Sequence, residues 1–270
     1  VERGGEPHKG ISMTEKLLLE IKDHTAIITI NNPGANTWDA ENLTALRDRV
    51  AELNANDEIY SLVITGQGEK FFSAGADLKM FASGDKQVAR DLAEKFGAAF
   101  EALANFRGVS IAAINGYAMG GGLECAMACD IRIAEAQAVM ALPEATVGLL
   151  PAGLGTQHLA WLVGEGWAKR MILCGERVDA ATAERIGLIE EVVAKGEALS
   201  SAMALAAKVE GQSPTSVSAC KQLIQAARAG SITDAYQAER DAFVDLFDTQ
   251  DQAEGVNAFL QKRKPQWKNA

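Results

Sequence analysis

Two short apolar runs of this chain each lead into a glycine-rich loop, and this pattern limits the possible folds more than any other feature. Ser61–Thr65 and Ser110–Ile114 have the length and composition of buried strands. The second run leads to the triplet Gly120–Gly122, and a short helix is predicted over Leu123–Ala128. Buried strands that alternate with helices indicate a mixed α/β architecture.

The remaining elements predict an α/β first half and a helical second half. Leu17–Ile21 and Thr25–Asn31 are β-rich runs that predict a hairpin. Asp39 can cap a helix that ends near Asn54, and another helix is expected over Lys86–Asn105. Later helices are predicted over Thr156–Val163, Gly166–Leu173, Ala180–Ile186, Glu197–Val209, Pro214–Ala229, Ile232–Phe247 and Asp251–Arg263.

The halves are not separated by a linker rich in proline, serine or charge. Because 270 residues suffice for one large domain, we expect a continuous α/β core over residues 13–200 that holds the active site. Residues 201–270 should form a helical C-terminal region. Residues 1–12 are polar and glycine-rich, and we interpret them as a leader outside the fold.

The formal net charge of −10 limits the partners of the chain. An acidic surface opposes non-specific binding to nucleic acid or anionic lipid. No apolar run reaches the ~18 residues that a membrane span needs, and no secretory signal is recognisable. We expect a cytoplasmic protein without nucleic-acid or membrane partners.

Cysteine and histidine are too sparse for a typical structural metal site. The four cysteines contain no CxxC pair, and the three histidines are scattered along the chain. We expect buried free thiols, as in a reducing cytosol, and no bound metal.

The two glycine-rich loops are candidates for binding an oxygen anion. The first is Ser73–Asp77, and the second is Asn115–Glu124. Glycine lets the backbone approach a ligand closely, and a helix N-terminus presents free N–H groups. Two such loops facing each other would form an oxyanion hole for a developing enolate. A phosphate loop is excluded because no Gly-Lys-Ser/Thr closes either loop, and the spacing is not that of a dinucleotide fold.

Two acids lie in apolar sequence beside these loops. Glu124 follows the glycine triplet, and Glu144 follows Pro143. Carboxyl groups are rarely buried without a reason, and burial raises a carboxyl pKa towards the range useful for proton transfer at neutral pH. Each acid alone is more often a cap or a solvated side chain, whereas both together beside two anion-binding loops indicate acid–base chemistry.

These motifs resemble those of the crotonase superfamily, and the sequence is most similar to its enoyl-CoA hydratases. The resemblance extends from about Leu17 to Trp267. It rests on four ordered motifs: Phe72–Lys79, Asn115–Glu124, Pro143-Glu144 with Gly148, Pro151 and Gly155–Gln157, and finally Asp251–Gly255 with Phe259–Lys264.

The resemblance implies a spiral of ββα units, and it implies that the helical region over residues 201–270 serves oligomerisation into trimers or hexamers and closes over the coenzyme. It implies reversible hydration of a trans-2-enoyl-CoA in fatty-acid β-oxidation, with Glu124 as base and Glu144 as acid. Backbone N–H groups of Ala76 and Gly121 would hold the thioester oxygen. Further substrate contacts are expected from Ala35, Ala74, Asp77, Leu78, Lys79, Tyr117, Gly120, Pro143, Phe259 and Lys262. No cofactor is expected, because coenzyme A is part of the substrate.

Other readings remain open. An enoyl-CoA isomerase usually needs only one acid, and a dehydratase forming an unsaturated acyl-CoA would look the same in sequence. An RNA-binding relative is disfavoured by the net charge.

The sequence departs from the family pattern at two places. The loop Pro33–Asn36 lacks the lysine common in relatives, and Ala152 stands where relatives often have glycine. The region Met80–Gln87 is expected to shape the acyl pocket, and its first part, Met80–Gly84, predicts an apolar wall without a charged specificity group.

Overall fold

In the computed structural model, which describes residues 14–270, the larger sheet begins with a hairpin at its edge. Strand β1 (Leu17–Lys22) pairs antiparallel with β2 (Thr25–Ile30), and the register places Leu17 opposite Ile30. The predicted hairpin is therefore confirmed. The proposed leader, residues 1–12, lies outside the described residues.

From β2 onwards this sheet is parallel, in the order β1-β2-β3-β5-β7-β10. The added strands are β3 (Ser61–Gly66), β5 (Val109–Ile114), β7 (Ile131–Glu135) and β10 (Glu191–Val193). Strands buried on both faces have nearly continuous apolar sequences, which is why β3 and β5 are predictable. The short β10 has no such run and is not predicted by the sequence.

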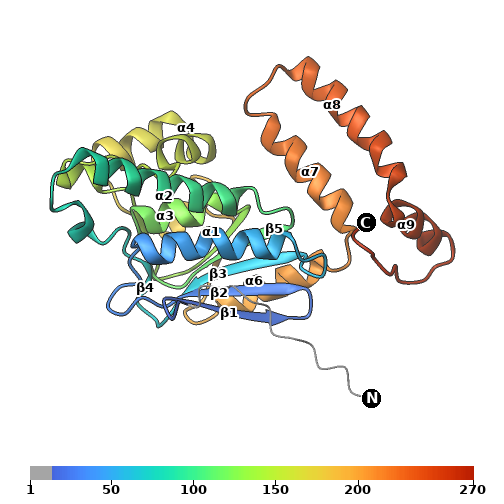
Figure 1. The fold of residues 1–270 in the computed structure, drawn as a ribbon, viewed down its shortest axis with the longest axis horizontal. Helices are drawn as coiled ribbons and strands as arrows, with labels where there is room; N and C mark the ends of the chain where they lie inside the picture. Colours follow the sequence, from blue (N-terminus) through green and yellow to red (C-terminus); the bar gives the residue numbers. More distant parts are fainter. Residues whose placement is uncertain (1–13) are drawn as a thin grey trace.

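The two faces of the larger sheet are covered by different helices, because alternate side chains of a strand point to opposite faces. Ile64 faces the main core, which also contains buried side chains of α1 (Ala40–Asn54) and α2 (Lys86–Ala104). Its neighbour Val63 faces the other way and packs with alanines of α6 (Ala198–Val209). In Figure 1, α1 and α2 lie above the sheet and α6 lies below it.

A second sheet has the order β4-β6-β8-β9. Its strands are β4 (Phe71–Ser73), β6 (Tyr117–Met119), β8 (Val139–Ala141) and β9 (Val178–Asp179). Strands β4, β6 and β8 come directly after β3, β5 and β7, and each leads on to a helix. The chain therefore repeats a strand–strand–helix unit, as the expected spiral requires, although such short strands carry no pattern that sequence analysis can detect.

Glycine explains two differences from the predicted helices. Helix α3 (Gly121–Ala128) begins inside the glycine triplet rather than at Leu123. Helix α4 (Gly155–Leu173) replaces two predicted helices, which are its two parts on either side of a break at Gly164, where φ is 76°. Helix α5 (Ala180–Arg185) confirms the helix predicted over Ala180–Ile186.

Three C-terminal helices stand apart from this body and form an arm (Figure 1). They are α7 (Pro214–Ala226), α8 (Ile232–Asp245) and α9 (Gln250–Leu260), with the short turn η3 (Leu246–Asp248) before α9. The division predicted at residue 200 falls inside α6, which packs on the sheet. The helices that stand apart begin later, with α7.

The arm has a polar attachment and apolar outer surfaces. Lys221 Nζ on α7 donates to the carbonyl groups of Phe106 and Gly108 and to the carboxylate of Asp130. Many apolar side chains of the arm are exposed: Ile224, Tyr236, Phe243, Val244, Phe247, Phe259 and Leu260. Exposed apolar surface of this extent is typical of protein–protein interfaces.

The helices and the cysteines bear on two predictions, the lack of a membrane span and the burial of free thiols. None of the helices over residues 14–270 is long and apolar enough to cross a membrane. The four cysteines are free thiols, and Cys125 and Cys129 are buried as predicted. The prediction is wrong for Cys174 and Cys220, which are exposed because one ends α4 at the surface and the other lies on the arm.

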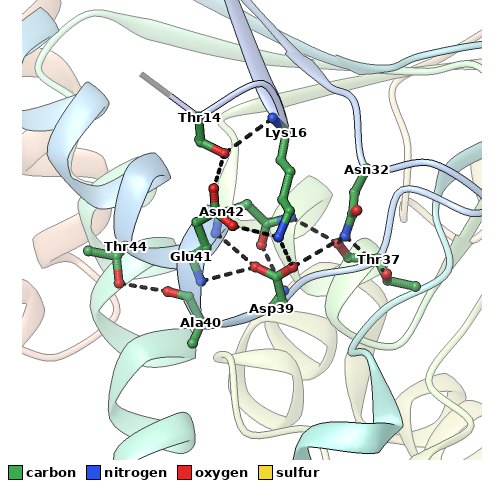
Figure 2. A network of polar contacts seen from close by, with 9 residues as sticks. All are labelled: Thr14, Lys16, Asn32, Thr37, Asp39, Ala40, Glu41, Asn42 and Thr44. Atoms are coloured by element: carbon green, nitrogen blue, oxygen red, sulfur yellow. Dashed lines mark hydrogen bonds and ion pairs between the residues drawn. The ribbon is translucent and has the colours of Figure 1, made fainter. Parts of the chain in front are cut away.

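A polar cluster fixes the start of α1, and Figure 2 shows its contacts. The Asp39 carboxylate accepts hydrogen bonds from the backbone of Glu41 and Asn42, and the Asn42 side chain accepts one from the Asp39 backbone. Lys16, just before β1, donates to the same carboxylate at 2.7 Å. Burial acts to raise the pKa of Asp39, but these hydrogen bonds outweigh it and lower the pKa. The charged cap thus links the hairpin to the helical layer.

Replacing Asp39→Ala should lower the free energy of unfolding by about 1–2 kcal/mol, because two backbone donors of α1 and Lys16 lose their acceptor. Urea denaturation followed by circular dichroism at fixed protein concentration measures the change. Asp48→Ala, a half-exposed acid on the same helix, is the matched control and should stay within about 0.5 kcal/mol. Equal losses in the two variants would contradict the capping role of Asp39.

Candidate active site

The first glycine-rich loop leaves β4 and is fixed by backbone contacts with residues before α1. Trp38 N–H donates to Gly75 O at 2.8 Å, and Asp77 N–H donates to Trp38 O at 2.8 Å. Ala74 N–H donates to Ala35 O at 2.9 Å. This ladder uses the residues on either side of Ala76, so the Ala76 N–H points away from Trp38 and donates to no acceptor within residues 14–270.

The second loop connects β6 to α3. Gly120 has a φ of 52°, a backbone conformation that suits glycine, and its N–H donates to Ala141 O at 2.9 Å. Gly121 is the first residue of α3, so its N–H has no partner within the helix. The loop therefore presents a free N–H at the positive end of a helix dipole.

The two loops are in direct contact, and only glycine allows this. A Cβ atom on Gly122 would lie 2.2 Å from Ser73 O, and one on Gly75 would lie 2.7 Å from Met119 O and 3.3 Å from Gly121 N. Such distances are too short for any real side chain. The Ala76 and Gly121 loops are thus held side by side, as an oxyanion hole requires.

A pocket of about 280 Å³ lies beside the loops and contains both predicted acids. Its lining includes residues of the first loop, the second loop and the segment after Pro143. A larger cavity, of about 730 Å³, lies between α3, α4 and α7, but neither Glu124 nor Glu144 lines it. The chemistry therefore belongs to the smaller pocket.

Glu124 is the buried acid of the pair, with 3% of its surface exposed. Its Oε1 accepts hydrogen bonds from Gly153 N–H and Gly155 N–H, both at 2.8 Å. Burial raises the pKa of Glu124 to about 7, and nearby Glu144 also raises it, while the two N–H donors lower it. A carboxyl group with this pKa can exchange a proton at neutral pH.

Glu144 begins the short turn η2 (Glu144–Val147) and is half-buried. Burial raises the pKa of Glu144, and its Oε2 has no hydrogen-bond partner within the described residues. Its Oε1 lies against the second loop, since a Cβ on Gly120 would be 2.9 Å from it. An unpartnered buried carboxyl oxygen is costly unless it serves a ligand or carries a proton.

The structure brings most of the other predicted residues to this place, but not all. Residues that line the pocket are Ala74, Ala76, Leu78, Gly120, Gly121 and Pro143. Residues that lie next to the loops without lining it are Ala35, Asp77, Lys79 and Tyr117. Phe259 and Lys262 lie on the arm or just after it and are exposed, so within one chain they do not reach the pocket.

Arg177 is a pocket residue that the sequence motifs do not indicate. It precedes β9, which pairs antiparallel with β8, and Met140 lies opposite Val178 in this register. That pairing brings Arg177 to the end of β8, the strand that leads to Pro143 and Glu144. Phe81, from the segment expected to form an apolar acyl wall, lines the pocket, and Arg177 adds a charged group from a different element.

Comparison with known proteins agrees with this geometry. The family described as Enoyl-CoA hydratase/isomerase matches residues 20–270. The chain is similar to the short-chain-enoyl-CoA hydratase of Clostridium acetobutylicum, with 37% identity over 92% of this chain and 95% of that protein. Among solved structures it is similar to DspI of Pseudomonas aeruginosa, with 64% identity and a TM-score of 0.94 over 97% of this chain and 100% of that one. An enoyl-CoA hydratase from Bacillus anthracis has a TM-score of 0.91 at 32% identity over 95% of this chain and 100% of that one.

The ββα spiral and its facing glycine loops define a protein of the crotonase fold. Within that class, this chain belongs to the enoyl-CoA hydratase/isomerase family.

Gly122→Ala should lower the free energy of unfolding by about 1–3 kcal/mol, because the new Cβ would push the first loop away at Ser73. Gly97→Ala in the interior of α2 is the matched control: its Cβ would meet nothing closer than 3.5 Å, and alanine favours a helix. We expect the control to be neutral or slightly stabilised in urea denaturation. Similar losses in both variants would mean that the loops are not tightly packed.

Proposed function

We propose that this protein is an enoyl-CoA hydratase that adds water reversibly to a trans-2-enoyl-CoA and gives a 3-hydroxyacyl-CoA. The observation that carries the proposal is that two carboxyl groups with raised pKa values line the same pocket as the two glycine-rich loops. The similarity to a protein named short-chain-enoyl-CoA hydratase supports the same reaction. We place the reaction in the β-oxidation of fatty acids.

In the proposed reaction the thioester oxygen accepts hydrogen bonds from the N–H groups of Ala76 and Gly121. These donors withdraw electrons from the conjugated double bond and make the β-carbon electrophilic. They also stabilise the enolate oxygen that develops, and removing one such donor typically costs about 3–4 kcal/mol of transition-state energy. The donors are fixed before the substrate arrives, because the loops are packed against each other.

Glu124 and Glu144 divide the proton transfers between them. A water molecule adds its oxygen to the β-carbon while ionised Glu124 takes one of its protons. The electron pair of the double bond moves towards the thioester oxygen and returns to the α-carbon, which takes a proton from Glu144. Because the groups share one water, they should titrate as a coupled pair. The proposed reaction uses these side chains and backbone donors, and coenzyme A enters as part of the substrate.

A second acid distinguishes this proposal from double-bond isomerisation, which usually needs only one. Both acids line this pocket, and Glu144 keeps an unpartnered oxygen. Dehydration of a 3-hydroxyacyl-CoA, which would form an unsaturated acyl-CoA, is the same reaction in reverse and uses the same groups.

We further propose that the assembly is a homotrimer or a pair of trimers in which the arm of one copy reaches the pocket of the next. The arm exposes Phe259 to 84% and places Lys262 in solvent. Phe259 would contact the acyl or adenine part, and Lys262 would bind a phosphate of coenzyme A. Such a cation is needed because the chain as a whole is acidic, with a net charge of −10.

Glu124→Gln and Glu144→Gln should each lower the rate of hydration by about 10²–10⁴-fold, because glutamine cannot take or give the proton. The rate is followed by the loss of enoyl absorbance with crotonyl-CoA and then with a medium-chain enoyl-CoA. In the unaltered protein kcat/KM should rise with pH through about 7 as Glu124 ionises. Glu94→Gln on the exposed side of α2 is the matched control and should retain full activity. Full activity of Glu144→Gln would refute the assignment.

Lys262→Ala should raise KM for crotonyl-CoA by about tenfold and leave kcat unchanged, because it removes one charge–phosphate contact. KM for the pantetheine thioester, which lacks the nucleotide phosphates, should not change. Lys169→Ala, an exposed lysine on α4, is the control. Light scattering should give a mass of three or six chains, and a monomeric active enzyme would rule out a contact from a neighbouring copy.

A further inference from the structure

The turn that holds Glu124 contains a leucine in an unfavourable backbone conformation. Leu154 has a φ of 78° and a ψ of −4°, which is the left-handed region. Of the non-glycine residues with positive φ in the described part of the chain, Leu154 is the one with an apolar side chain; the others are Asp23, Asn36, Lys262 and Asn269. A Cβ atom makes this region costly for leucine, so the surrounding structure must hold it there.

This conformation determines where the neighbouring N–H groups point. Gly153 and Gly155, on either side of Leu154, both donate to Oε1 of Glu124 at 2.8 Å. Left-handed residues between ordinary ones make concave turns whose N–H groups converge on an anion. Leu154 is also the N-cap of α4 and has no side-chain acceptor, and Glu124 accepts a hydrogen bond from Gly155 N–H, the first N–H group of the helix.

The Leu154 side chain lies away from the reacting groups. It packs against the main core and lines the 730 Å³ cavity between α3, α4 and α7, whereas Gly153 lines the catalytic pocket. The turn thus separates two cavities. Its backbone faces the acid, while its side chain is anchored on the other side.

Building on the proposed function, we propose that Leu154 is a positioning residue for the base. Its anchored side chain keeps the turn left-handed, and the turn directs two N–H groups to one oxygen of Glu124. Glu124 Oε2 receives no hydrogen bond from a protein donor within residues 14–270 and is the oxygen left to take the proton from water.

The groups around Glu124 limit what else could change its titration. Glu144 lines the same pocket from η2, and Arg177 lines it from the start of β9. Helix α2 presents the ring of Phe96 to the pocket and the ring of Phe100 to Gly153, and its Glu101 lines the larger cavity on the other side of the turn. His158 of α4 lies on the other side of the turn, where it bonds to Met127 O, and burial lowers its pKa. A substitution at Leu154 removes none of these groups.

Comparing Leu154→Ala with Leu154→Gly separates the backbone conformation from the side-chain packing. Both variants lose the anchored side chain, but only alanine keeps the Cβ that disfavours the left-handed turn. Leu154→Ala should release the N–H donors, move the acidic limb of the kcat/KM profile upward by about one pH unit and lower kcat at neutral pH about tenfold, with little change in KM. Leu154→Gly should keep the profile of the unaltered protein.

Leu162→Ala is the matched control, because Leu162 is also partly buried, lies on α4 and lines the same cavity, but has no contact with the turn's donors. It should reduce stability without moving the profile. Equal shifts in Leu154→Ala and Leu154→Gly would overturn the proposal, since packing alone would then explain them. An unchanged profile in Leu154→Ala would overturn it as well.

Measuring the pKa of the Glu124 carboxyl without substrate tests the role of Leu154 independently of the proposed reaction. Infrared difference spectra recorded across pH, with Glu124→Gln as the reference, give the pKa of the Glu124 carboxyl directly. That pKa should rise in Leu154→Ala and not in Leu154→Gly, even if the protein does not hydrate enoyl-CoA. Absence of hydration with this pattern intact would refute only the reaction, whereas hydration without this pattern would refute only the role of Leu154.

Discussion

The two hydrogen bonds from Gly153 and Gly155 to Glu124 are the contact on which the geometry of the pocket depends. A carboxylate buried in apolar surroundings needs donors, and the first N–H groups of a helix need acceptors. The acid at the start of α3 and the N-terminus of α4 meet both needs at once. The bonds oppose the effect of burial, and the pKa of Glu124 stays near 7, where a base can act at neutral pH.

The second sheet explains why the three chemical segments meet. Strands β4, β6 and β8 are adjacent and parallel, so their carboxyl ends leave the same edge. The first loop, the second loop and the Pro143-Glu144 segment begin directly after them. The N–H groups of Ala76 and Gly121 and the carboxyl group of Glu144 therefore come from neighbouring strand ends. The other acid, Glu124, lies on α3, the helix that follows the second loop. The absence of a Cβ atom at Gly122 allows the two loops to lie this close together.

Sequence reasoning could find the parts of this site that depend on local chemistry. Glycine is required at 75 and 122 by backbone contacts and at 120 by a positive φ, and both acids lie in apolar sequence, so these positions were recognisable. Strands β6, β8 and β9 could not be predicted, because two or three residues carry no periodicity. Arg177 depends on that unpredicted pairing of β9 with β8, and the left-handed Leu154 depends on tertiary packing. Both arise from contacts between distant segments.

A single chain leaves two apolar surfaces exposed, one at the rim of the pocket and one on the arm. Leu78, Val147, Leu149 and Leu150 form an exposed apolar rim of the pocket, with 40–66% of their surface accessible. The arm carries the exposed rings of α8 and α9 on the opposite side of the body from β4 (Figure 1). Since they do not cover each other within the chain, and since burial of both would be favourable, a neighbouring copy is the simplest cover for each. The proposed trimer would bury both surfaces and would close the pocket over its exposed apolar rim.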